Sequence, residues 1–306
     1  MTDRHSKQDV MRWLEDGVSI IPGFFSDQEI TPLAEAYETL YGDARPDADK
    51  AMNRKGDGQI GAFNRHQFLH FDALPFGGGV ALDLLPLHPA LIRFARAALG
   101  VPDVHLYQAH TWAKFTGETD FDQPFHCDFG NHTLTVPADE PEHRTINFVV
   151  YLTNVTDGHG ALHYVTKPDA REALGEDALV AETPERQAAL MTRSRSAAAP
   201  AGSVVAYGID AFHRGTNLTL PGAHRYTMTI SYKAAGNEQI GFHVWQASPE
   251  RDWAPILTRG APEQLAALGI PLPGDPFWTA RTLKLTQARW PDWNMKPWME
   301  GAEKPQ

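Results

Sequence analysis

The chain has 306 residues, 42% of them hydrophobic, and a formal net charge of −11. This length and apolar content suffice for one large core or two modest ones. Because no Ser/Gly linker or abrupt charge block divides the chain, a single domain over residues 1–306 is favoured. The acidic balance argues against nucleic acid as a partner, since the average surface field would repel phosphates.

The N-terminal segment MTDRHSKQDVMRWLEDG is charged and lacks the apolar core of a signal peptide. No window approaches the roughly 18 consecutive apolar residues of a membrane span. We therefore expect a cytoplasmic protein that has no membrane partner and is a monomer or homodimer. The single cysteine, Cys127, excludes an internal disulfide framework and a thiolate-rich zinc or iron–sulfur site.

Two capping boxes predict the first helices. Ser6 with Asp9 opens a short helix that stops at Gly17, and the following VSIIP has the pattern of a strand. Ser26 with Glu29 opens a second helix whose apolar residues repeat at helical spacing. We expect this second helix to cover one side of a sheet.

Residues 45–79 are rich in Gly, Asn, Asp and Arg but also contain several phenylalanines. This composition predicts a long functional loop or lid, with a surface loop held by aromatic anchors as the alternative. The segment contains an HxD pair, His70 and Asp72, which is followed by a proline and three glycines rather than by a strand pattern. Further on, Pro89–Leu99 is predicted to be a helix that ends at Gly100.

From Val104 onward the pattern is that of strands. In VHLYQAHTWAKF, period-two alternation places one set of side chains on a common face. The members of this set are Leu106, Gln108, His110, Trp112 and Lys114. A face of this polarity is either solvated or lines a polar cavity inside a sandwich or barrel.

Further strands are predicted for RTINFVVYL, for ALHYV returning from the turn DGHG, for GSVVAYG and for RYTMTISYK. Residues 168–200 form a predicted helical insert, with one helix beginning at Thr183 and Pro184. The tail contains a predicted helix at Pro262–Leu268 and several tryptophans that we expect to pack on the outside of the sheet. The predicted fold is mainly β with flanking helices, around a double-stranded β-helix (jelly-roll) core.

The most informative residues are His126 and Asp128 in QPFHCDFGNHTL, which alternation places on the same side of a strand. His213 follows far downstream, and Arg225 lies in the next strand, RYTMTISYK. Two imidazoles and one carboxylate on one side of a metal are typical of non-haem Fe(II) oxygenases. Two alternatives are a cupin-like isomerase or hydrolase with another divalent metal, and a non-catalytic binding protein on the same scaffold.

Several motifs together resemble the phytanoyl-CoA dioxygenase family of Fe(II)- and 2-oxoglutarate-dependent oxygenases, which includes ectoine hydroxylase. The resemblance begins with GVSIIPGFFSDQEI and continues through FHCDF at the HxD position. DGHGALHYVTKPDA is similar to the family's turn and strand, although Val-Thr-Lys-Pro stands where the family has Pro-Gly-Ser-His. AGSVVAYGIDAFHRGTNLT and the following arginine resemble the distal-histidine strand and the co-substrate arginine.

The resemblance implies that His126, Asp128 and His213 bind Fe(II) and that Arg225 binds the far carboxylate of 2-oxoglutarate. A guanidinium fits such a carboxylate because the two groups are planar and can pair bidentately. Gln108 and Lys114 match positions that contact the co-substrate in similar enzymes. Further candidates near the site are Thr216, Asn217 and Asn147, whereas His224 falls on the opposite strand face and is predicted not to be a ligand.

The implied reaction consumes 2-oxoglutarate and O2, releases succinate and CO2, and hydroxylates a small molecule. Halogenases related to this family have a small residue in place of the carboxylate, so Asp128 favours an oxygenase outcome. The substrate class stays open between a CoA thioester and an amino-acid-derived or natural-product molecule. Aromatic residues suggest a hydrophobic or ring-bearing substrate. The candidates for contacting it are Trp112, Phe68, Phe125 and Trp245.

Overall fold

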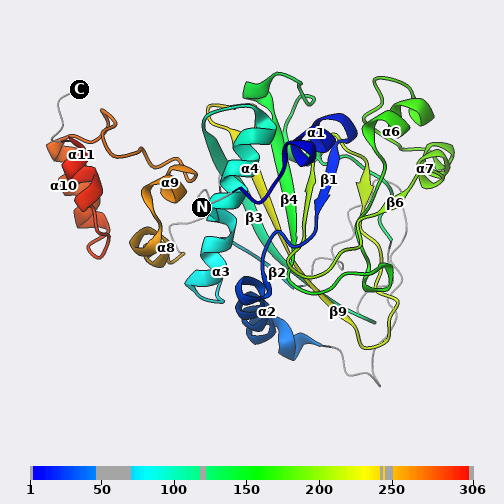
Figure 1. The fold of residues 1–306 in the computed structure, drawn as a ribbon, viewed down its shortest axis with the longest axis horizontal. Coiled ribbons are helices and arrows are strands. Elements are labelled where there is room, and N and C mark those ends of the chain that lie inside the picture. The colour runs from blue at the N-terminus through cyan, green and yellow to red at the C-terminus, as the bar shows by residue number, and fades with distance from the viewer. Residues whose placement is uncertain (1–2, 46–69, 118–121, 242–243, 245–250, 303–306) are drawn as a thin grey trace.

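A computed structural model describes residues 3–45, 70–117, 122–241, 244 and 251–302. Its centre is a six-stranded antiparallel sheet in the order β1-β7-β4-β9-β3-β2, and a three-stranded sheet in the order β6-β5-β8 lies beside it (Figure 1). The strands are β1 (Val18–Ile21), β2 (His70–Ala73), β3 (Val104–Phe115), β4 (Thr145–Tyr151), β5 (His163–Tyr164), β6 (Arg195–Ser196), β7 (Val204–Tyr207), β8 (His213–Arg214) and β9 (His224–Ala234).

Helices flank these sheets and also extend beyond them at the C-terminal end (Figure 1). The α-helices are α1 (Lys7–Asp16), α2 (Asp27–Tyr41), α3 (Val80–Leu84), α4 (Pro89–Leu99), α5 (Phe129–His132), α6 (Lys167–Leu174), α7 (Pro184–Met191), α8 (Ala254–Arg259), α9 (Pro262–Ala266), α10 (Ala280–Arg289) and α11 (Lys296–Ala302). None of the helices in the described part of the chain combines the length and apolar character needed to cross a bilayer.

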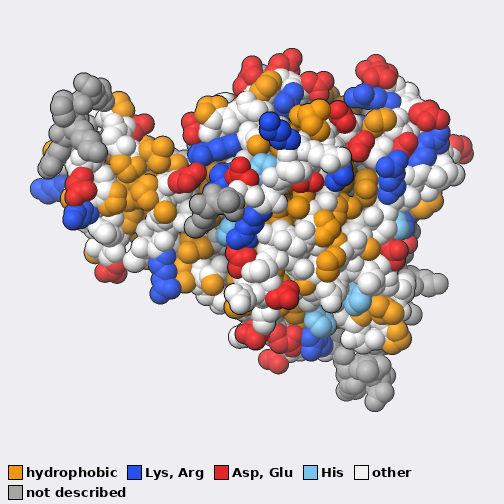
Figure 2. Space-filling view, in the orientation of Figure 1, with side chains coloured by type: hydrophobic (Ala, Val, Ile, Leu, Met, Phe, Trp, Pro, Cys, Tyr) orange, Lys and Arg blue, Asp and Glu red, His pale blue; other side chains and the backbone are white. Residues whose placement is uncertain are grey.

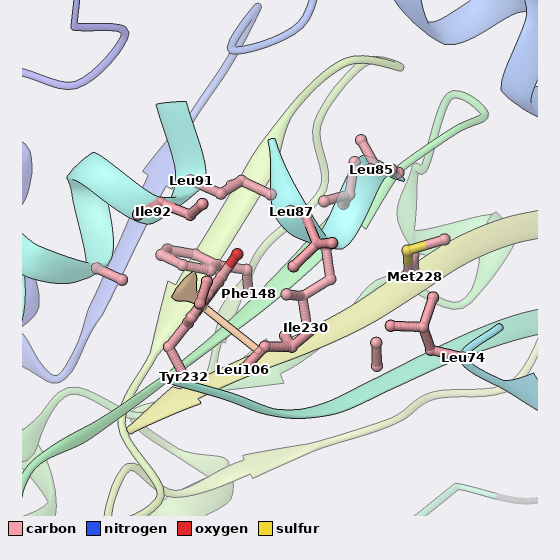
Figure 3. Close-up of a cluster of buried hydrophobic side chains, with 14 of the residues drawn as sticks. Leu74, Leu85, Leu87, Leu91, Ile92, Leu106, Phe148, Met228, Ile230 and Tyr232 are labelled. Carbon is pink, nitrogen blue, oxygen red and sulfur yellow. The ribbon is translucent and has the colours of Figure 1, made fainter. Parts of the chain in front are cut away.

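The large sheet has two chemically different faces because side chains alternate along each strand. One face carries the apolar side chains of β4 and β9, which pack against α4 and the short 3-10 helix η3 (Leu85–Leu87) (Figure 3). Phe148, Ile230 and Tyr232 are fully buried in this layer. The opposite face carries the polar residues of the same strands, so the main core and the polar face lie on different sides of one sheet.

The predicted helix signals are confirmed. Ser6 and Asp9 form a capping box at the start of α1, and Gly17 ends the helix in the left-handed conformation with φ 76°. Ser26 and Glu29 form the capping box of α2. The hydroxyl of Tyr37 in α2 donates to the carbonyl of Thr227 in β9 over 2.8 Å, which fixes this helix on the sheet as expected.

Part of the segment predicted as a lid, 45–79, is sheet. His70–Ala73 forms β2, the edge strand paired with β3, so the prediction that the second HxD pair does not lie on a strand was wrong. Asp72 instead forms an ion pair with Arg251 at 3.0 Å. Positions 46–69 lie outside the described residues. The helical insert predicted at 168–200 contains α6 and α7, and α6 begins one residue earlier.

The alternation predicted for β3 holds only in part. The register between β3 and β9 shifts between Leu106 and Gln108, which marks a β-bulge. Gln108, His110, Trp112 and Lys114 share one face, but Leu106 packs in the main core on the other face. The bulge places Tyr107 outside the simple alternation.

The strand β5 does not return along β4 as the turn predicted. It pairs with β6 and β8 in the small sheet, so the chain crosses from one sheet to the other after the turn. The hairpin interpretation was wrong because a turn motif sets the direction of the chain but not the sheet that the next strand joins. This crossing places β5 in the small sheet beside the large one.

The C-terminal tryptophans were also predicted wrongly. Trp278, Trp293 and Trp298 pack on one another, with ring centroids 4.8–6.4 Å apart, rather than lying on the outside of the sheet. Trp298 lies in α11, while Trp278 and Trp293 lie just before and just after α10. Figure 1 shows α10 and α11 beyond α8 and α9, away from the strands. Hydrophobic side chains gather on the surface of this part (Figure 2). Phe277 and Leu285 are exposed hydrophobic residues of the same segment.

Truncation of Ile230 tests the main core. Ile230→Ala removes buried methyl groups between the sheet and its helices, so we expect a loss of about 2–5 kcal/mol of unfolding free energy in urea denaturation. Leu285→Ala, on the exposed surface of α10, is the control and should change it by less than about 0.5 kcal/mol. Equal effects of both substitutions would contradict this assignment of the core.

Asp83 gives a pH-dependent prediction. Burial raises its pKa from 3.8 to about 6, although its carboxylate accepts a hydrogen bond from the Phe76 N–H at 2.6 Å. The cost of burying the charge is therefore present above about pH 6 and absent below the ordinary carboxyl pKa. Asp83→Asn keeps the acceptor and removes the charge, so it should stabilise the protein by about 1–3 kcal/mol at pH 7.5. Urea denaturation should show this gain shrinking as the pH falls to 4, whereas an equal gain at both pH values would contradict the prediction.

Candidate metal centre

An antiparallel bridge brings the two ligand segments together. The backbone N–H of His126 donates to the His213 carbonyl, and the N–H of His213 donates to the His126 carbonyl, each over 3.0 Å. Asp128 Oδ1 lies 3.6 Å from Nε2 of His126 and 3.5 Å from Nε2 of His213. The three ligand atoms lie within 4.8 Å of one another, which is close enough to hold one metal ion. No other such group occurs among the residues that the structure describes.

Both imidazoles are oriented for metal binding. Nδ1 of His126 lies 2.9 Å from the Pro124 carbonyl, and Nδ1 of His213 lies 3.0 Å from the Ala211 carbonyl. A carbonyl accepts, so each Nδ1 carries a proton, and Nε2 is the nitrogen that can bind a metal once it has lost any proton of its own. The two Nε2 atoms are the ones that face Asp128.

The carboxylate is ready to act as a ligand. Burial alone would raise the pKa of Asp128, but the charge of His213 and hydrogen bonds from both imidazoles outweigh burial and hold this pKa well below its usual range. The pKa of His126 is raised because its interactions with Asp128 outweigh the effect of burial. A divalent cation would replace the imidazolium protons as the positive partner of this carboxylate.

The end of β7 and the loop that leads to β8 form hydrogen bonds with each residue from Cys127 to Phe129. The hydroxyl of Tyr207 donates to Asp128 Oδ2 at 3.0 Å, and the N–H of Phe129 donates to the Ile209 carbonyl at 3.0 Å. Cys127 Sγ donates to the Asp210 carbonyl at 3.3 Å rather than pointing to the ligand atoms. Burial raises the pKa of Cys127, so it remains a thiol rather than a metal-binding thiolate.

The candidate co-substrate residues lie on the polar face of the large sheet. Arg225 is directly opposite Lys114 in the register of β9 and β3. Gln108 is opposite Ser231, whose hydroxyl donates to it at 3.2 Å. Arg225 is half-buried, and within the described part of the chain no carboxylate forms an ion pair with it. A partly buried guanidinium without an acidic partner is suited to an anionic ligand.

Two of the predicted site residues serve the local structure. The hydroxyl of Thr216 donates to the Ala161 carbonyl at 2.7 Å, which ties β8 to the chain before β5. Phe125 is 2% exposed in a separate hydrophobic cluster with Val165 and Phe212. The ring of Phe125 fills that cluster, so the prediction that it contacts substrate is not consistent with its position.

Trp112 is on the polar face of β3. Its indole N–H donates to Thr229 at 3.0 Å, and its ring stacks on Phe71 of β2 at 5.3 Å. His110 contacts both rings edge-on, so the three form an aromatic cluster on β2 and β3. The two other aromatic residues predicted to contact substrate, Phe68 and Trp245, lie outside the described residues.

Near the ligands, Asn147 was a candidate from the sequence, whereas Tyr107, His132 and Tyr207 were not. Tyr107 lies at the β-bulge and its hydroxyl is 2.7 Å from Nδ1 of His132. The same hydroxyl is 3.4 Å from Asn147 Oδ1, and Asn147 is fully buried with no partner for its Nδ2 among the described residues. Tyr207 ends a strand that reads as uniformly apolar, so period-two alternation could not identify it.

Comparison with known proteins agrees with this geometry. The profile described as Phytanoyl-CoA dioxygenase (PhyH) matches residues 13–227, which include all three ligands and the arginine. The chain belongs to the phytanoyl-CoA dioxygenase family, and thereby to the Fe(II)- and 2-oxoglutarate-dependent oxygenases. A search of curated proteins finds no match to this sequence.

Solved structures show the same fold at low sequence identity. EctD from S. alaskensis in its apoform is 18% identical with a TM-score of 0.56, and the match covers 82% of this chain and 83% of that one. The α-ketoglutarate-dependent carbocyclase SnoK from nogalamycin biosynthesis is 20% identical with a TM-score of 0.53, covering 76% and 87%. AviO1 from Streptomyces viridochromogenes Tue57 is 19% identical with a TM-score of 0.54, covering 77% and 98%. The jelly-roll prediction is therefore confirmed.

Removal of one ligand tests the centre directly. His213→Ala should weaken Mn(II) binding by more than about 100-fold, because it removes a ligand rather than one of the groups that orient the ligands. Mn(II) binding can be followed by the EPR signal of the free ion. His224→Ala is the matched control, since His224 contacts Tyr226 and Phe115 rather than the ligands, and should bind as wild type does. Equal loss in both variants would contradict the ligand assignment.

Proposed function

We propose that this protein hydroxylates an unactivated C–H bond of a small molecule, consuming 2-oxoglutarate and O2 and releasing succinate and CO2. The observation that carries the proposal is the combination of the His126, Asp128 and His213 group with Arg225 on the polar face of β9. A metal-dependent isomerase or hydrolase would need the three ligands but would have no use for a half-buried arginine to which the described residues offer no acidic partner.

The roles of the chain's own residues follow from their positions. His126, Asp128 and His213 would hold Fe(II), while Arg225 would bind the distal carboxylate of 2-oxoglutarate with Lys114 beside it. Bound together, iron and 2-oxoglutarate supply the oxidising chemistry. The protein positions the reactants and keeps bulk water from the site, which is lined on one side by buried residues such as Tyr207 and Asn147.

A hydrophobic or ring-bearing substrate is supported by the aromatic cluster of Phe71, His110 and Trp112 on the polar face. Flat rings of this kind offer apolar area and stacking geometry to a planar partner. SnoK is described as a carbocyclase, so proteins of this fold reach outcomes besides hydroxylation. Product analysis, together with succinate release, is therefore part of identifying the reaction.

Anaerobic addition of Fe(II) and 2-oxoglutarate tests the proposal. A weak visible charge-transfer band should form in the wild-type protein, and Arg225→Ala should raise the 2-oxoglutarate concentration needed for it by about 10- to 100-fold, as expected when a charged hydrogen-bonding partner is removed. Arg193→Ala, which removes only a surface ion pair with Glu172, is the control and should leave the titration unchanged. A folded wild-type protein that binds Fe(II) but shows no band would contradict the proposal.

Candidate substrates can then be ranked by the extra succinate that they release from the wild-type enzyme in air. A true substrate should stimulate succinate release and give a product 16 mass units heavier for hydroxylation, as one oxygen atom is inserted. A compound that stimulates release without gaining oxygen would indicate another oxidative outcome.

A further inference from the structure

The two oxygens of Asp128 have different surroundings. Oδ1 faces Nε2 of both histidines at 3.5–3.6 Å, on the side where the metal position lies. Oδ2 instead accepts a hydrogen bond from the hydroxyl of Tyr207 at 3.0 Å. One oxygen therefore belongs to the ligand set, and the other is held by a phenol.

The position of this phenol is determined by packing. Tyr207 is the last residue of β7, opposite Val18 of β1 on one side and Asn147 of β4 on the other. Its side chain is only 5% exposed, and it packs with Tyr151 and Val205 in a second hydrophobic cluster. Its ring also lies 4.7 Å from the His213 ring. Packing around the Tyr207 ring therefore fixes the position from which its hydroxyl donates to Asp128.

We propose that Tyr207 is a positioning residue that keeps Asp128 monodentate, with Oδ1 alone directed at the metal. A carboxylate whose outer oxygen is not held can swing to bind through both oxygens and so take up an additional coordination position. The inference rests on the proposed function, in which the positions left by the three protein ligands receive 2-oxoglutarate and O2. Holding Oδ2 would keep those positions available.

Tyr207→Phe removes the hydroxyl and keeps the ring in its cluster. We expect about a 10- to 100-fold weaker affinity for Mn(II), measured by EPR without 2-oxoglutarate, as is typical when a group that orients a ligand is lost. The visible d–d absorption of the Co(II)-loaded protein should also change, because it depends on the number and arrangement of the ligands. These two readouts do not require turnover.

Tyr232→Phe is the matched control. It removes another buried phenol hydroxyl, which donates to the Pro86 carbonyl in the main core on the opposite face of the sheet. This variant should lower thermal stability but keep the wild-type Mn(II) affinity and Co(II) spectrum. Tyr207→Gln provides a second test because its amide can donate where phenylalanine cannot. If positioning by a donor matters, its Mn(II) affinity should exceed that of Tyr207→Phe despite poorer packing.

Folded Tyr207→Phe that binds Mn(II) within about twofold of wild type and gives an unchanged Co(II) spectrum would overturn the inference while leaving the proposed function intact. The same holds if Tyr207→Gln binds more weakly than Tyr207→Phe, since packing alone would then explain the loss. A wild-type protein that binds no Mn(II) would overturn both the metal centre and the inference. Weaker binding confined to the Tyr207 variants, with rescue by glutamine, would support it.

Discussion

Two backbone hydrogen bonds between His126 and His213 are the constraint on which the candidate centre depends. The strand predicted through the HxD pair is not formed: His126 is a single bridge residue, and Asp128 has helical backbone angles just before α5. The bridge sets the two imidazoles beside each other, and the turn after His126 brings Asp128 within reach of both. The bridge joins the HxD segment to β8 of the small sheet, far away in the chain, so the centre forms only when these segments have folded together. Metal affinity and tertiary folding are therefore coupled in this protein.

The two faces of the large sheet have different roles: one packs in the main core, and the other carries the candidate functional residues. Its apolar face supports the main core with α4 and η3, while its polar face presents Arg225, Lys114 and the aromatic cluster. Because alternate residues of the same strands serve the two faces, a shift of register by one residue would exchange them. The many fully buried apolar residues of β4 and β9 thus hold the register on which the polar residues rely.

Local signals in the sequence were sufficient for most elements and for the ligands. Capping boxes at Ser6 and Ser26 placed two helices, and the HxD pair with a distant histidine and arginine pointed to the right group. What escaped prediction depends on contacts between distant segments. The β-bulge beside Tyr107, the entry of β5 into the other sheet and the edge pairing of β2 are all decided by neighbouring strands. Tyr207 was missed for the same reason, since nothing in VVAY distinguishes a phenol that reaches a carboxylate from one that packs.

The orientation and protonation of Cys127 affect how readily the protein is oxidised. Its sulfur sits between two ligand residues in sequence, but it is turned to the Asp210 carbonyl and remains protonated. Oxidants attack the thiolate form far more readily than the thiol, and access also matters. The single sulfhydryl of this oxygenase is therefore kept in the form that oxidants attack most slowly.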